Sequence, residues 1–250
     1  MTDSKQIADY CDSLLNAAGF DDYCPNGLQV EGDRPVRRLL SGVTASQSLV
    51  DAAVAEDVDA LLVHHGYFWR GEDARLVGMK GRRVRTLMRA GISLLAYHLP
   101  LDAHPDLGNN RRLATVLDLC DPVSTEAGKG LVWRGDLPEP MTGAAFAEHI
   151  RVALGGAPVH IQVLKRPLRS LAWCSGGAQG FLPAVAELGV DAYLSGEISE
   201  QTTHEARELG LDFFAAGHHR TERYGVWALG DHIAERFGVE HSFQDLDNPA

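Results

Sequence analysis

The chain has 250 residues, and 45% of them are hydrophobic, so it can bury a large core as one large domain or two small ones. Acidic residues outnumber basic ones by 34 to 23, which gives a net charge of −11. Such a charge repels phosphate backbones and anionic membrane surfaces, and it argues against nucleic acid as a partner.

The N-terminal segment and the cysteines bear on the cellular compartment. No basic start followed by an apolar run opens the chain, and no window is apolar enough to cross a bilayer. The four cysteines are widely spaced and form no C-x-x-C pair, so we expect them to be reduced and buried. These features predict a soluble, cytoplasmic protein that does not contact a membrane.

Short β-rich segments alternate with helical patterns along the chain, which is typical of an α/β fold with largely parallel strands. Leu49, Val50 and Ala53 repeat at helical spacing, as do Phe146 and Ile150. The predicted strands are residues 38–43, 58–63, 92–97, 159–164, 171–174, 190–195, 211–216 and 239–243. We therefore expect mixed, largely parallel sheets flanked by helices.

The two halves of the chain resemble each other. An ungapped shift of 132 residues places Leu39 on Leu171 and the segment 58–60 on the segment 190–192. A shift of 120 residues places His98 and Asp102 on His218 and Glu222. A duplicated βαβ unit explains these matches, and the polar segment 121–140 is the expected junction. We therefore predict two related α/β halves, residues 1–130 and residues 131–250.

Histidines follow two predicted strands of the first half. His64 and His65 end the buried strand 58–63, at the edge where open α/β sheets place ligands. Neighbouring strand residues point to opposite faces, so both imidazoles can share one site only if the strand has ended in a turn, which Gly66 permits. His98 and Asp102 follow the next strand, in a segment that two prolines predict to be a rigid loop.

The second half supplies further candidates. His218 and Glu222 follow the strand 211–216 and are four residues apart, so they can converge on one ion if a helix begins nearby. Neutral imidazole and carboxylate together suit zinc, iron, manganese, cobalt or nickel without choosing among them. Glu197 follows another strand and could act as a base or as a partner that orients a metal ligand, and the Gly176–Gly177 turn could offer amides to a phosphate.

Five segments together make the chain similar to a known family. They are Asn26-Gly27-Leu28-Gln29-Val30, Gly42-Val43-Thr44-Ala45-Ser46, His64-His65-Gly66, His98-Leu99-Pro100-Leu101-Asp102, and Gly217-His218 with Thr221-Glu222. In this order they resemble the GTP cyclohydrolase 1 type 2 homologues, a family of dinuclear metal proteins. The similarity spans nearly the whole chain and corresponds to the short form of the family, without a large insertion.

This resemblance implies a site and an assembly. The implied metal ligands are His64, His65, Asp102, His218 and Glu222, with Glu222 bridging two divalent ions in each chain. The implied assembly is a ring-shaped homohexamer. His98 and Glu197 are not among these five implied ligands, so we assign those two side chains to proton transfer.

Two classes of function remain open from the sequence. The first is a metal-dependent hydrolase acting on a nucleotide or a related heterocycle, because two ions with five protein ligands keep positions for water. The second is a metal-binding or scaffold protein without turnover. Structural metal sites are usually closed and rich in cysteine, which this ligand set is not, so the sequence favours a hydrolase.

Overall fold

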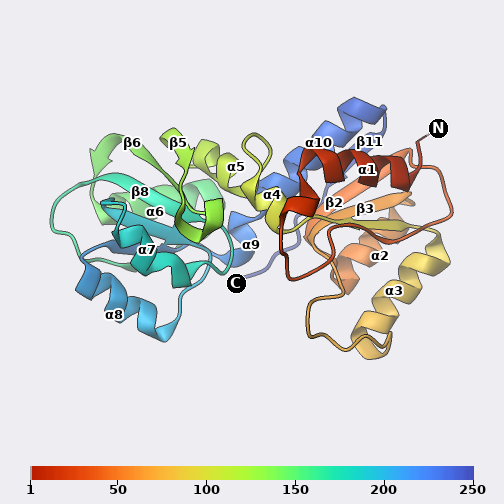
Figure 1. Ribbon diagram of the computed structural model, residues 1–250, viewed down its shortest axis with the longest axis horizontal. Coiled ribbons are helices and arrows are strands. Elements are labelled where there is room, and N and C mark those ends of the chain that lie inside the picture. The colour runs from red at the N-terminus through yellow and green to blue at the C-terminus, as the bar shows by residue number, and fades with distance from the viewer. Residues whose placement is uncertain (1) are drawn as a thin grey trace. The chain divides into compact units, whose positions relative to one another are not determined.

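The computed structural model describes residues 2–250, which form two compact units (Figure 1). The first unit comprises residues 2–107 and Gly225–Asp247, and the second comprises Gly108–Tyr224 and Asn248–Ala250. This division differs from the expected one near residue 130. Most of helix α10 (Arg223–Phe237) and strand β11 (Glu240–Phe243) belong to the first unit although they come late in the sequence.

The first unit is a sheet covered by helices on both faces (Figure 1). Within residues 2–250, its strand order is β1, β4, β3, β2, β11, with β1 antiparallel at one edge and the other strands parallel. Leu62 packs with α1 and α10, whereas Leu61 and Val63 pack with α2 and α3, so β3 is apolar on both faces. The remaining elements are α1 (Ser4–Leu14), a 3-10 turn (Ala17–Gly19), β1 (Gly27–Val30), β2 (Arg38–Thr44), α2 (Gln47–Ala55), β3 (Ala60–His65), α3 (Gly78–Ala90), β4 (Ser93–Ala96) and α4 (Leu99–Ala103).

The second unit has the same layered arrangement around a mixed sheet. Within residues 2–250 its strand order is β5, β6, β8, β9, β10, β7; β8, β9 and β10 are parallel, and the flanking pairs are antiparallel. Helices α5 and α6 cover one face, and α7 and α8 the other. Its elements are α5 (Asn109–Val116), β5 (Cys120–Ser124), a 3-10 turn (Ala127–Gly130), β6 (Trp133–Met141), α6 (Gly143–Leu154), β7 (Val159–Ile161), β8 (Leu168–Cys174), a 3-10 turn (Gln179–Phe181), α7 (Leu182–Ala186), β9 (Ala192–Ser195), α8 (Glu200–Leu209), β10 (Asp212–Ala215) and α9 (His218–Thr221).

The predicted α/β class and all the predicted strands are confirmed, but other strands were missed. The segment 121–140 is no linker, because it contains most of β5 and nearly all of β6. In β6, Trp133, Gly135 and Leu137 are buried, whereas Arg134 and Asp136 are exposed. This alternation is typical of a half-buried strand. The strand was missed because prolines and charged residues surround the alternating segment.

The duplication is visible in the strand register of each unit. Leu39 pairs with Ala60 in parallel strands, and the residues 132 positions later, Leu171 and Ala192, pair in the same way. Two buried carboxylates repeat as well. Asp59 accepts hydrogen bonds from the amides of residues 37 and 38, and Asp191 accepts them from the amides of residues 169 and 170.

Two local expectations were wrong. Cys11, Cys24 and Cys174 are buried, but Cys120 is exposed because it lies on the edge strand β5. The segment after His98 is the short helix α4 rather than a loop, since Pro100 falls in its first turn, where no backbone donor is needed.

None of the helices within residues 2–250 has the length and apolarity that crossing a bilayer requires.

Candidate metal centre

Three histidines of the first unit cluster where β3 and β4 end. The ring centroids of His64 and His65 are 4.7 Å apart, and that of His98 lies 5.1 Å from the first and 5.7 Å from the second. One nitrogen from each ring lies within 4.8 Å of the others. No turn was needed to bring the first two together, because both are still residues of β3. The cluster offers three convergent nitrogen ligands.

The orientations of His64 and His65 are set through their Nδ1 atoms. The buried His64 donates from Nδ1 to the backbone carbonyl of Tyr97, at 2.8 Å, which leaves Nε2 as its basic nitrogen. That Nε2 lies 3.5 Å from an oxygen of Asp102, in the first turn of α4. Nδ1 of His65 is 3.1 Å from the hydroxyl of Thr44. Metal-binding histidines are commonly oriented in this way, through the ring nitrogen that does not face the ion.

His98 is held by Asp22, which the sequence analysis did not identify. His98 donates from Nδ1 to Asp22 at 2.7 Å, and its backbone N–H donates to the side chain of Asn26, also at 2.7 Å. Asp22 accepts further hydrogen bonds from the Asn26 amide group and from the backbone of Tyr23 and Leu99. Burial opposes ionisation, but these hydrogen bonds and the nearby His98 lower the pKa of Asp22 to about 2.

Asp22, Cys24 and His98 also place ligand-type atoms close together. The oxygens of Asp22 already accept hydrogen bonds from three residues besides His98, and the 2.7 Å separation from the His98 ring is that of a hydrogen bond. This group therefore anchors His98 rather than forming a second ion site.

The second unit repeats the anchoring at His218. Its Nδ1 lies 2.7 Å from Glu197 and its Nε2 lies 3.1 Å from Glu222. Burial lowers the pKa of His218, but the hydrogen bonds and charges of Glu222 and Glu197 outweigh it and raise the pKa to about 9. A metal ion at this imidazole must therefore displace a proton below about pH 9.

The turn after β8 packs closely against the carboxylate of Glu222. A Cβ atom at Gly176 would lie 2.1 Å from an oxygen of Glu222, and the residue has φ +67°, so glycine is needed here for both reasons. The turn does not suit a phosphate. The amides of Gly176 and Ala178 already donate to Thr221 and Ser195, and Glu197 lies beside Gly177.

The comparisons with known proteins come from sequence and structure. The sequence profile of the family described as Duf34/NIF3 (NGG1p interacting factor 3) matches residues 2–249. The chain belongs to the Duf34/NIF3 family. Its relatives named "GTP cyclohydrolase 1 type 2 homolog" include proteins of Allochromatium vinosum, 58% identical over 100% of this chain and 98% of the relative, and of Pseudomonas aeruginosa, 56% identical over 98% and 97%.

Solved structures agree with this assignment. Protein ybgI, described as of unknown function, is 44% identical with a TM-score of 0.94, and TTHA1606 from Thermus thermophilus is 37% identical with a TM-score of 0.90. Both comparisons cover 100% of each chain. The resemblance stated from the sequence motifs is thus confirmed, and so is the fold.

In this Duf34/NIF3 protein, the predicted site residues fall into two local groups. His64, His65, His98 and Asp102 gather in the first unit, and Glu197, His218 and Glu222 gather in the second. His104 and His204 lie outside these groups, since His104 accepts from the amides of residues 106 and 107 and His204 is exposed beside Glu200.

The anchoring residues were the part of the site that sequence reasoning missed. Asn26 and Thr44 stood within the family's motifs without a role, and Asp22 lay just outside them. The only sequence signal was the proximity of Asp22 to the Asn26-Gly27 motif. Its contact with a histidine 76 residues later could be found only in the fold.

Asp22→Asn should change how the protein's stability depends on pH. The lowered pKa means that ionised Asp22 stabilises the fold fully above its unfolded pKa of about 4, and that this stabilisation is lost as pH falls towards 2. The variant should therefore lose about 1–2 kcal/mol at pH 7, measured by chemical denaturation, and should approach the parent at pH 2.

The matched control is Asp21→Asn, a neighbouring carboxylate whose side chain is 87% exposed. It should leave the pH profile nearly unchanged. Parallel profiles of the parent and Asp22→Asn from pH 7 to pH 2 would show that the Asp22 network does not stabilise the ionised carboxylate.

Proposed function

We propose that this protein binds two divalent transition-metal ions through His64, His65, Asp102, His218 and Glu222 and hydrolyses a nucleotide or a related heterocycle. The observation that carries the proposal is the common arrangement of the histidines. Each of the three proposed ligand histidines has Nδ1 against a carbonyl, hydroxyl or carboxylate, which orients Nε2 and fits a metal ligand. Imidazole and carboxylate donors together suit zinc, iron, manganese, cobalt or nickel.

The chemistry divides between the bound ions and the surrounding side chains. When bound, the ions would supply Lewis acidity and lower the pKa of a water molecule. His98 contributes proton transfer in this scheme. Its Nδ1 proton is committed to the ionised Asp22, so Nε2 is the atom that accepts a proton from the attacking water and returns it to the leaving group.

The contact of Glu197 with His218 favours one of the two roles expected for this carboxylate. Its oxygen lies 2.7 Å from Nδ1 of His218, which favours orientation of that imidazole over the proton transfer predicted from the sequence. The corresponding anchor of His98, the counterpart of His218 in the repeat, is the carboxylate of Asp22, so both units orient this imidazole with an acidic side chain.

The ligand assignment predicts how metal content responds to substitution. The parent should carry about two ions per chain, because five ligands exceed what one open site requires. His64→Ala, Asp102→Ala and Glu222→Ala should each lower the content measured by elemental analysis, with circular dichroism unchanged. The control is His204→Ala, which removes an exposed imidazole. Full occupancy in all three ligand variants would refute the assignment.

The proton-transfer assignment predicts that substitution of His98 lowers turnover without lowering metal content. His98→Ala should keep its metal and lose about 10²- to 10⁴-fold in turnover on a nucleotide identified by screening with each metal. Glu197→Ala should instead bind metal about 10- to 100-fold more weakly, as expected for a group that orients a ligand.

The opposite results are equally informative. Loss of metal from His98→Ala would make His98 a ligand, and metal retention with lost turnover in Glu197→Ala would restore its proton-transfer role. A metal-loaded protein that turns over no nucleotide or phosphoester would support the non-catalytic metal-binding function instead.

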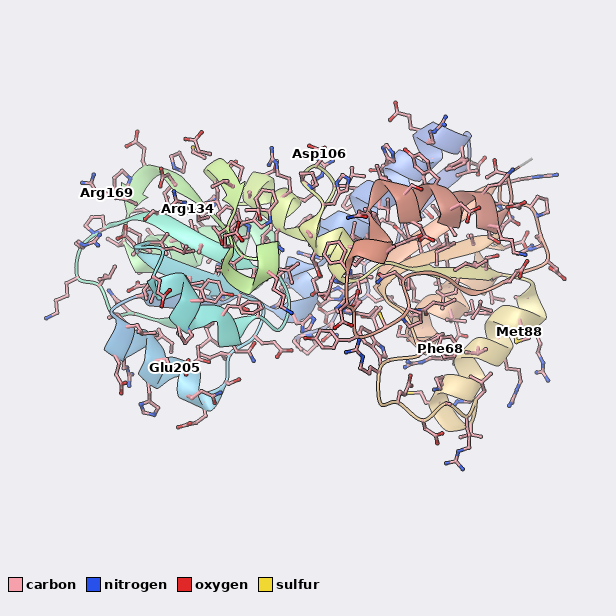
Figure 2. All side chains as sticks on the ribbon, in the orientation of Figure 1. Phe68, Met88, Asp106, Arg134, Arg169 and Glu205 are labelled. Atoms are coloured by element: carbon pink, nitrogen blue, oxygen red, sulfur yellow. The ribbon has the colours of Figure 1, made fainter. Side chains whose placement is uncertain are left out.

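The protein is also proposed to be a cytoplasmic homohexamer, as the family resemblance implies. Self-association is supported by exposed apolar side chains on and just before α3, namely Leu76, Val77, Met79 and Met88, of which Met88 is labelled in Figure 2. Light scattering at micromolar concentration should give six times the monomer mass. A monomer mass under these conditions would exclude the assembly.

A further inference from the structure

Two aromatic side chains border the histidine cluster of the first unit. The ring centroid of Trp69 lies 5.1 Å from that of His98, nearly perpendicular to it, and 6.0 Å from that of His65. The ring of Tyr23 lies 6.4 Å from that of His98, and its side chain is largely exposed. Trp69 is half-buried and Tyr23 is largely exposed, so a partly accessible aromatic surface adjoins the imidazoles of His65 and His98.

Trp69 is not part of the hydrophobic core described for its unit. Phe68, labelled in Figure 2, packs on the core formed with α2 and α3 and lies under Lys80 of α3. Trp69 belongs to none of the core clusters within residues 2–250. The backbone at Phe68 has φ +66°, a conformation that bulky residues rarely adopt. This turn directs Phe68 towards the core and Trp69 towards the imidazoles.

The strained loop is fixed by hydrogen bonds. The Trp69 indole N–H donates to the carbonyl of Gly66, and the amide of Tyr67 donates to Gln29. Arg70 ties the loop to the segment that carries Asp22, since its backbone N–H donates to the carbonyl of Tyr23 and its guanidinium donates to Asp21. Backbone strain that many contacts maintain is characteristic of ligand-binding loops.

We propose that Trp69, assisted by Tyr23, is the stacking surface for a planar heteroaromatic ring of the substrate. This inference rests on the proposed function and identifies its ring-binding residues. A preoriented indole loses little entropy on binding and offers its face to any flat ring. A fixed aromatic face gives no such advantage to a flexible aliphatic substrate.

The test measures binding of nucleosides, which carry the ring without a phosphate. Adenosine, guanosine and cytidine are titrated by calorimetry into the full chain, both metal-loaded and after chelator treatment. Trp69→Leu should bind the preferred nucleoside about 5- to 150-fold more weakly, the range for losing one stacking partner, and Trp69→Phe should retain most of the affinity. Ribose 5-phosphate, which has no aromatic ring, serves as the comparison ligand.

Trp227→Leu is the matched control, because Trp227 is an exposed tryptophan of the same unit that stacks on Phe243. It should bind nucleosides like the parent, and metal content should be unchanged in every tryptophan variant. Failure of all three nucleosides to bind the parent, or equal affinities of the parent and Trp69→Leu, would overturn the proposal. Nucleoside binding without turnover would instead count against the hydrolase function and leave the stacking surface in place.

Discussion

The candidate centre depends on one hydrogen bond per histidine, made by the ring nitrogen that faces away from the proposed ions. A free imidazole can rotate and can carry its proton on either nitrogen. Acceptors at Nδ1 of His64, His98 and His218 remove both freedoms and leave Nε2 as the basic nitrogen. These acceptors lie just after β4, before β1 and after β9, and their positions determine where the imidazoles stand.

The candidate ligand positions could be proposed from the sequence, whereas the residues that orient them could not. Histidine and carboxylate after apolar strands were visible because the strands are long apolar segments and ligand sites lie at their carboxyl ends. Asp22 was not visible, because no periodicity connects a loop residue with a histidine far along the chain. The boundary between the units was missed for a related reason: the C-terminal helix joins the first unit through packing with α1 and the sheet, which local patterns do not encode.

The repeat explains why the two units share some features and differ in others. Ser93 and Asp212 occupy equivalent places in the sheets, since they pair with Ala60 and Ala192. Counted from these strand starts, His218 comes one residue later than His98, and Gly217, with φ +98°, stands just before it. His98 is anchored by Asp22 in the loop before β1, whereas His218 is anchored by Glu197 just after β9. This change of anchor accompanies the one extra residue between strand and histidine in the second unit.

Asp59 and Asp191 show how such divergence is compatible with a stable fold. Each carboxylate binds backbone amides at the amino ends of the strands, while the imidazoles and carboxylates of the two candidate groups stand at or just beyond the carboxyl ends. Strand pairing is thus stabilised at the amino ends of the strands, whereas the candidate site residues lie at the carboxyl ends. Substitutions at the carboxyl ends therefore leave the hydrogen bonds of Asp59 and Asp191 intact, which makes each unit a scaffold on which a new ligand set can evolve.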